Sequence, residues 1–278
     1  MDFQTFITAH GYTAPPSIQC GVIQKIAALG KKQGNTSARV KLFSDALGGW
    51  LFDWTTGQFE IWQAERQTLS RQQQAELLAE RKRLQAEREA EQAAAHAQAA
   101  QTALAIWDDN MTCGSHPYLS RKRVQPHGIK SDWNRQLVLP LYDEHHTLAS
   151  LQFIDCDGSK RFLKGGKVKG CHWWLSGKTD TVLIAEGFAT AASLFESTGQ
   201  HTVIAFNAGN LRPVAKTIRK AFPNAEIIIM GDHDSSGVGE KAAREAALAV
   251  GGKFMIPPLL PDTEKTDWND YINNGGAL

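Results

Sequence analysis

Acidic side chains stand at two points where an apolar run ends. Glu186 follows the run 182–185, and Asp232 and Asp234 follow the run 226–230. A lone aspartate in such a place often caps the next helix, but three acids at two strand ends, each end carrying an adjacent glycine, favour a cation site. Oxygen ligands suit Mg²⁺ or Mn²⁺, and phosphate can complete their coordination shell. The spacing therefore predicts a divalent metal site formed by these three carboxylates.

Alternating strands and helices must position these acids. The pattern predicts strands at 182–185, 202–206, 226–230 and 253–256, with helices at 189–196, 212–222 and 239–250 between them. Such alternation is typical of a parallel sheet covered by helices on both faces. Ligands of open α/β sheets bind beyond the carboxyl ends of the strands. The acids are expected at that edge.

Positive charge gathers in the preceding segment, residues 106–178. Two strands are predicted there, at 137–141 and 150–155, and glycines interrupt the basic stretch that follows. Glycine lets a backbone approach a polyanion closely, and lysine supplies charge. We predict a basic loop for nucleic acid or a triphosphate, with an ordinary solvated hairpin as the alternative. The candidate binding residues are Arg121, Lys122, Arg123, Arg161, Lys164, Lys167, Lys169 and, beside a helix N-terminus, Lys241.

A long helix is predicted upstream. No glycine or proline occurs between Gly57 and Gly114, and residues 64–105 are mostly Ala, Gln, Glu, Arg and Leu. These are strong helix formers, and such a helix would be about 60 Å long. Its apolar positions are too few for a sustained heptad seam. A single helical spacer is expected, and a homodimeric coiled coil is the weaker alternative.

The first 63 residues form a small α+β module in this reading. A helix is predicted at 3–10, and Trp50, Phe52 and Trp54 recur with the period of a strand. Such an aromatic stripe could stack nucleobases. Because stripes of this kind more often form the core, we expect these rings to be buried.

Composition limits the class of protein. The 278 residues carry a net charge of +1, and 42% are hydrophobic and 21% charged, which argues against global disorder. No apolar run approaches the ~18 residues of a membrane span, and the N-terminus lacks the pattern of a signal peptide. We expect a cytoplasmic protein without a membrane partner. The four cysteines form no Cys-x-x-Cys pair, so zinc is not expected.

The C-terminal residues resemble the TOPRIM domain of DnaG-type primases, topoisomerases and some nucleases. The similarity is greatest to primases of conjugative plasmids and phages, and it rests on the stretches 186–194, 206–211, 231–234 and 266–270. Residues 118–124 are similar to the start of a primase core. DnaG-type primases carry a further acid where this chain has Thr190, and they carry a zinc-binding domain.

The resemblance implies a fold in four parts. It implies a small α+β N-terminal module at 1–63, a long helix or spacer at 64–105, a basic α+β primase subdomain at 106–178, and a TOPRIM parallel-sheet catalytic domain at 179–278.

The implied activity is that of a DNA primase, which makes RNA primers on single-stranded DNA from ribonucleoside triphosphates. Asp232 and Asp234 would hold the metal on the triphosphate, and Glu186 would hold a metal near the attacking hydroxyl or serve as its base. Asp267 and Asp270 would complete a second metal site, supported by Asn207 and Asn269. No helicase P-loop is present, so a separate replicative helicase would unwind the template.

Two other functions remain open. A TOPRIM-type metal-dependent nuclease would use the same acids. A non-catalytic DNA-binding replication accessory protein would be expected to lack one of them, whereas Glu186, Asp232 and Asp234 are all present.

Overall fold

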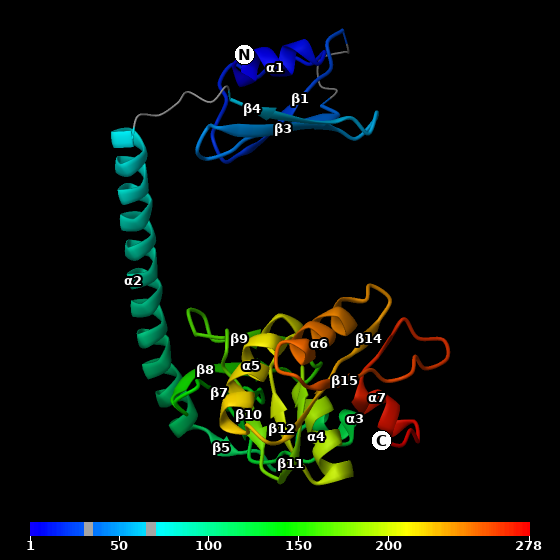
Figure 1. The fold of residues 1–278 in the computed structure, drawn as a ribbon. Coiled ribbons are helices and arrows are strands. Elements are labelled where there is room, and N and C mark those ends of the chain that lie inside the picture. The colour runs from blue at the N-terminus through cyan, green and yellow to red at the C-terminus, as the bar shows by residue number, and fades with distance from the viewer. Residues whose placement is uncertain (31–35, 65–70) are drawn as a thin grey trace. The chain divides into compact units, whose positions relative to one another are not determined.

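The computed structural model describes residues 1–30, 36–64 and 71–278 (Figure 1). Residues 65–70 of the predicted spacer lie outside the described residues. The chain divides into two compact units, Met1–Gln85 and Ala86–Leu278, which are described separately. None of the described helices has both the length and the apolar character needed to cross a bilayer.

The N-terminal unit is a four-stranded antiparallel sheet with one helix on it. The strands occur in the order β1 (Ile23–Ile26), β2 (Ala38–Leu42), β3 (Gly48–Asp53) and β4 (Phe59–Gln63). Helix α1 (Phe3–Ala9) is capped by Asp2, whose carboxylate accepts the Thr5 amide at 2.7 Å. Its residues Phe3, Phe6 and Ile7 pack in the core of this unit.

The aromatic stripe faces away from that core, so the prediction that it is buried is wrong. Leu51 is fully buried against the helix, whereas Trp50 and Phe52 are half-buried and Trp54 is 70% exposed. Alternation along a strand places these three rings on one face, but the period alone does not say which face the helix covers. Helix α1 covers the face that carries Leu51.

Helix α2 (Arg71–Asp109) confirms the predicted helix over its described part and continues beyond the predicted end at residue 105. The reason is packing in its last turns. Ala103 is fully buried in a cluster with Val138, Leu151 and Phe153. These turns therefore belong to the core of the second unit.

A five-stranded antiparallel sheet follows α2. Its strands occur in the order β5 (Met111–Thr112), β6 (Lys130–Ser131), β7 (Leu137–Tyr142), β8 (Leu148–Ile154) and β9 (Lys160–Phe162), and α3 (Pro117–Lys122) lies between β5 and β6 in the sequence. The two predicted strands are confirmed as β7 and β8. The basic stretch, predicted as a loop, begins as the edge strand β9.

The predicted parallel sheet is confirmed. Its order is β10 (Trp173–Leu175), β12 (Gln200–Ile204), β11 (Lys178–Ala185), β13 (Glu226–Met230) and β15 (Lys253–Met255), and only β10 is antiparallel. The helices are α4 (Phe188–Thr198), α5 (Ala208–Ala221) and α6 (Val238–Leu248). Helix α5 starts four residues earlier than predicted and contains Pro213 within it.

Helices cover both faces of this sheet (Figure 1). Leu183 and Ala185 point to the α4 face, while Val182 and Ile184 point to the face of α5 and α6. A two-stranded ribbon, β14 (His233–Asp234) with β16 (Lys265–Thr266), leads to the short helix α7 (Trp268–Asn273). The Trp268 indole N–H donates to the Gly231 carbonyl at 3.1 Å, which fixes α7 beside the end of β13.

Candidate active site

Two neighbouring strand ends position the predicted acids. β11 and β13 are paired in parallel with Ala185 opposite Met230, so Glu186 and Asp232 leave the sheet at the same carboxyl edge. The chain continues from β11 into α4 on one face and from β13 into α6 on the other. This is the topological switch point at which open α/β sheets bind ligands.

Glu186 and Asp232 form a pair of buried carboxylates. Among the described residues, Oε1 of Glu186 and Oδ1 of Asp232 are buried without a hydrogen-bond partner. Burial, reinforced by the charge of Asp232, raises the pKa of Glu186 to about 7. Burial also raises the pKa of Asp232. Unpaired buried anionic oxygens are costly, and a bound cation would remove that cost. The donor chemistry therefore fits a hard divalent metal.

Asp234 is engaged in the turn before α6. Its carboxylate accepts a hydrogen bond from the Ser236 hydroxyl, and the amides of Ser236 and Gly239 donate to it at 2.9 and 3.0 Å. These hydrogen bonds lower the pKa of Asp234 to about 2. Over residues 1–30, 36–64 and 71–278, no three His, Cys, Asp or Glu side chains are grouped as a ready metal site.

Two lysines that the sequence reasoning missed lie at these carboxylates. Lys265 reaches Asp232 from β16, with its Nζ 3.3 Å from Oδ2. Lys160 reaches the site from β9, since a Cβ added to Gly187 would lie 3.4 Å from the Lys160 Nζ. Burial lowers the pKa of Lys160, although the charges of Asp267 and Asp232 oppose the shift. Both lysines are brought in by long-range strand pairing, which local patterns do not reveal.

Lys122 completes a group of three ammonium ions, which we call the lysine cluster: Lys122, Lys160 and Lys265. Its Nζ lies 3.3 Å from Asp267 and 3.0 Å from Asp270. Burial alone would lower the pKa of Lys122, but these two carboxylates outweigh burial and raise it. The two acids predicted for a second metal thus hold an ammonium group here.

Most of the other predicted basic residues make contacts away from these acids. Arg161 lies over the Phe153 ring at 4.2 Å and donates to Gln136. Arg121 donates to the Cys156 carbonyl, and Arg123 donates to that of Asn273.

Four further predicted lysines lie on two other elements. Lys164, Lys167 and Lys169 lie on the segment between β9 and β10, and Lys241 is exposed on α6. At Gly165 that segment runs beside α2, because an added Cβ would lie 3.8 Å from the Ala95 carbonyl oxygen.

The two predicted asparagines have structural contacts. The Asn207 side chain caps α5 by accepting the Asn210 amide at 3.0 Å. The Asn269 amide group donates to the Lys122 carbonyl at 2.6 Å and to the Ser193 hydroxyl at 2.7 Å, while its Oδ1 is buried without a partner among the described residues. Asn269 therefore holds together the elements that carry Lys122 and Asp267.

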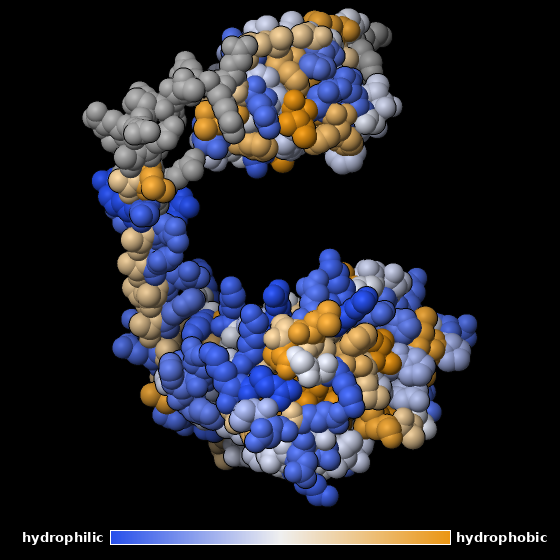
Figure 2. Space-filling model, in the orientation of Figure 1, coloured by the Kyte–Doolittle hydropathy of each residue, from blue (hydrophilic) through white to orange (hydrophobic). Residues whose placement is uncertain are grey.

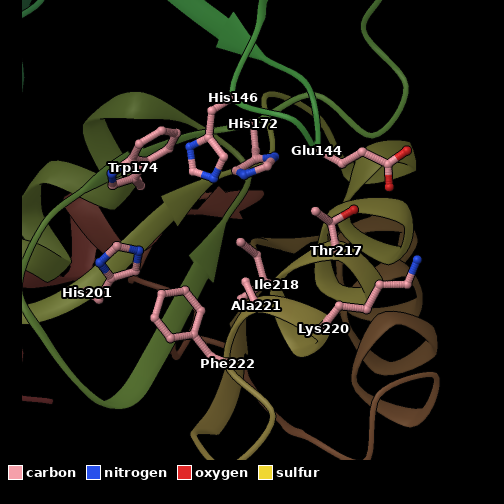
Figure 3. Close-up of a pocket in the computed structure, with 10 residues that line it drawn as sticks. All are labelled: Glu144, His146, His172, Trp174, His201, Thr217, Ile218, Lys220, Ala221 and Phe222. Carbon is pink, nitrogen blue, oxygen red and sulfur yellow. The ribbon is translucent and has the colours of Figure 1, made fainter.

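A pocket of about 410 Å³ lies near the amino end of β12, away from the strand ends that carry the acids (Figure 3). Its walls include three histidines, His146, His172 and His201, and the rings of Trp174 and Phe222. Burial lowers the pKa of His172 and of His201, so both are neutral at pH 7. None of the predicted site residues lines this pocket.

Comparison with known proteins agrees with the sheet and its acids. Residues 181–277 match the Toprim domain family. The chain is 35% identical over 221 residues to a DNA primase TraC of Escherichia coli, an alignment that covers 74% of this chain and 15% of that protein. A second Escherichia coli DNA primase TraC is 38% identical over 159 residues, covering 52% of this chain and 15% of the relative. The chain thus spans about 15% of the length of these curated relatives.

Among solved structures, the primase fragment of the bacteriophage T7 primase-helicase protein is 19% identical. That alignment has a TM-score of 0.46 and covers 61% of this chain and 72% of the fragment. The family match includes Asp232, Asp234 and Glu186 with the strands that position them. Residues 181–277 of this chain therefore belong to the Toprim domain family.

Proposed function

We propose that the chain is a DNA primase that synthesises short RNA primers on single-stranded DNA by metal-dependent nucleotidyl transfer. The observation that carries the proposal is the pair of buried carboxylates, Glu186 and Asp232, facing the lysine cluster within a Toprim domain. The similarity to two DNA primases supports the same activity. The resemblance to plasmid and phage primases suggests a role in the replication of a mobile element.

The metal ligands in this proposal are Glu186 and Asp232 first, because their buried oxygens have no other partner among the described residues. Asp234 is a further candidate that would have to leave part of its turn hydrogen bonding. When bound, Mg²⁺ or Mn²⁺ would neutralise charge on the triphosphate and on the attacking oxygen. Asp267 and Asp270 would reach a second cation only after releasing Lys122, so we assign them first to the placement of that ammonium group.

In the proposed reaction the 3′-oxygen of one nucleotide attacks the α-phosphorus of the next, and the bond to the β-phosphate breaks to release pyrophosphate. Phosphoryl transfer of this kind depends mainly on positioning and on charge neutralisation. The lysine cluster supplies positive charge next to the carboxylates and would hold the triphosphate. Glu186 has a pKa of about 7, so its Oε1 can accept the proton of the 3′-hydroxyl at neutral pH.

Single-stranded DNA, ribonucleoside triphosphates and a separate replicative helicase are the partners that the proposal requires. The basic loop with Lys164, Lys167 and Lys169, together with Arg121, Arg123, Arg161 and Lys241, is proposed to contact the DNA backbone outside the reacting centre. Their charges lie on exposed or half-exposed side chains, where phosphate contacts form without base specificity.

The test is Asp232→Asn in the full chain, incubated with single-stranded DNA, labelled ribonucleotides and Mg²⁺ or Mn²⁺. The wild type is expected to make short RNA products, and the variant to lose at least 100-fold of that activity, since it keeps its shape but loses the charge that binds the cation. Asp180→Asn, an exposed carboxylate in the same sheet, is the matched control and should retain activity.

A second readout separates metal binding from turnover. Mg²⁺ or Mn²⁺ should raise the melting temperature of the wild type and of Asp180→Asn, but not that of Asp232→Asn. Shortened DNA in place of new RNA would show that the Toprim centre belongs to a nuclease. Full RNA synthesis by Asp232→Asn would refute the assignment of the site.

A further inference from the structure

The N-terminal unit carries a sheet face that no helix of that unit covers. We call it the open face and define it by the outward residues of its four strands: Lys25, Arg39, Lys41, Trp50, Phe52, Phe59 and Ile61. The opposite face holds the core of the unit, with Val40, Leu51 and Trp62 buried under α1. Figure 2 shows hydrophobic residues at the surface of this unit among hydrophilic ones.

Exposed rings adjoin one another on the open face. Trp50 and Phe59 have ring centroids 6.4 Å apart, and Phe52 lies 6.2 Å from Phe59. Trp54 extends the row by an edge contact with Phe52 at 4.6 Å. Phe59 is 55% exposed and Trp54 is 70% exposed. Leaving such rings in water is unfavourable, and rings that neighbour one another offer a platform for other flat groups.

Cations border this row of rings. In the register of the sheet, Lys41 lies opposite Trp50 and Arg39 lies opposite Phe52. On the next strand Lys25 lies opposite Arg39. Positive charge therefore runs along one side of the aromatic row.

The acids of this unit point elsewhere. Asp2 caps α1, and Asp53 is buried and accepts a hydrogen bond from the Tyr12 hydroxyl at 2.8 Å. Glu60 is paired with Leu51 on the helix side and lies 3.9 Å from His10. Asp45 accepts the Leu47 amide in the turn between β2 and β3. Among the described residues, the strands of the open face thus present charge of one sign.

We propose that the open face binds single-stranded nucleic acid, with bases stacked on Trp50, Phe52 and Phe59 and the backbone phosphates on Lys25, Arg39 and Lys41. Stacking on aromatic rings next to a positively charged track is how sequence-tolerant single-strand binding is achieved. A four-stranded sheet face with exposed rings is one of the surfaces that does this. A protein partner would be expected to meet mixed charges around the apolar patch, which this face lacks.

The choice of DNA over RNA rests on the proposed function, whereas the binding of a single strand does not. In a primase the open face would be a second contact for the template, separate from the Toprim centre. Its contribution would be to hold the template to the chain, without any part in the bond-forming step.

The test uses the full chain and a fluorescent oligothymidylate of roughly 16 nucleotides, a length within the range that single-strand binding folds cover. Trp50→Ala combined with Phe59→Ala should weaken binding by about 10-fold or more, because two stacking surfaces are lost. Trp50→Phe combined with Phe59→Tyr keeps both rings and should retain binding. Trp133→Ala, which removes an 87% exposed ring from the second unit, is the matched control.

Salt dependence and crosslinking test the remaining parts of the proposal. Arg39→Ala with Lys41→Ala should lower the slope of log affinity against log salt by roughly 2, and Lys178→Ala should not lower it when the protein is compared at equal ionic strength. An oligonucleotide that carries 5-iodouracil should crosslink on irradiation to Trp50, Phe52 or Phe59. A polyuridylate competitor shows whether RNA binds equally well.

The proposal is overturned if Trp50→Ala with Phe59→Ala binds as tightly as Trp133→Ala, or if crosslinks map only to residues 86–278. In either case the open face would be a surface for a protein. Asp232→Asn should leave crosslinking to the open face unchanged. If the wild type crosslinks there but makes no RNA, the proposed activity fails and the binding surface stands; RNA synthesis without these crosslinks gives the reverse result.

Discussion

Glu186 links the charge of the candidate site to the stability of the fold. Its ordinary pKa of 4.5 rises to about 7 in the folded protein because the side chain is buried and lies near Asp232. The folded state therefore holds a proton that the unfolded state has already lost between these two values. Stability from the protonated form is fully present below about pH 4.5 and is lost as the pH rises through about 7.

Replacing Glu186 by Gln should remove this dependence. In the absence of divalent metal, the melting temperature of Glu186→Gln is expected to exceed that of the wild type by several degrees at pH 8, and to match it near pH 5. The measurement is thermal unfolding in EDTA across this range. Mg²⁺ should raise the melting temperature of the wild type at pH 8 and leave the variant unchanged. Parallel pH profiles for the two proteins would contradict the assignment.

Strand β9 determines which of its basic residues serves the site. Successive side chains of a strand point to opposite faces, so Lys160 and Arg161 cannot both face the acids. The structure places the Lys160 ammonium beside Gly187, and the Arg161 guanidinium over Phe153. A prediction from charge alone selected Arg161 and passed over Lys160.

This difference is testable by a matched pair of substitutions. Lys160→Gln is expected to lower kcat/KM for ribonucleotide incorporation by roughly 10²-fold, since it removes a buried positive charge at the triphosphate. Arg161→Gln should stay within about threefold of the wild type in the same assay, and both variants should unfold at similar temperatures. Equal losses for the two variants would show that β9 acts only through its total charge.

The elements that local sequence patterns predict well are those with strong periodicity. The four parallel strands and three helices of the Toprim sheet were predicted nearly to their ends, and they place Glu186 and Asp232 together. Helix α5 was started too late because the Arg212-Pro213 pair reads as a helix start, although Asn207 caps the helix earlier. Lys265 could not be predicted, since the pairing of β14 with β16 brings it to Asp232.

The aromatic stripe shows a different limit. Its period of two correctly places Trp50 and Phe52 on one face of β3. Whether that face is the core depends on where α1 docks, and the alternating Leu51 fits the core equally well by pattern. Docking of a helix on one of two apolar sheet faces is a tertiary choice that no short stretch of sequence encodes.

At the scale of the whole molecule, the boundary between the two units falls within α2, after Gln85. The helical residues beyond that boundary are needed by the second unit. Ala99 is 5% exposed and Ala103 is fully buried there. The segment that carries Gly165 also lies against this part of the helix.

Two truncations test this division. A fragment of residues 86–278 should fold, as judged by circular dichroism and a cooperative melt, and should gain stability from Mg²⁺ or Mn²⁺. A fragment of residues 101–278 lacks Ala99 and its turn, so we expect a melting temperature lower by several degrees. Equal stability of the two fragments would show that the helix before residue 101 contributes nothing to the second unit. An insoluble 86–278 fragment would show that the first unit is required for folding.

Helix α7 sets the order in which the site can be completed as the chain is made. Lys122 emerges from the ribosome first, then Lys160, then Glu186 and Asp232, and the acids that hold Lys122 come only with Asp267 and Asp270. At synthesis rates of about 5–20 residues per second, the nascent chain spends several seconds with Lys122 and the buried carboxylates unpaired by their final partners. The Trp268 indole bond to Gly231 then arrives last. A ribosome that stalls before α7 would release a Toprim sheet with its strands formed but its charged edge open, which is a substrate for cellular proteases and chaperones.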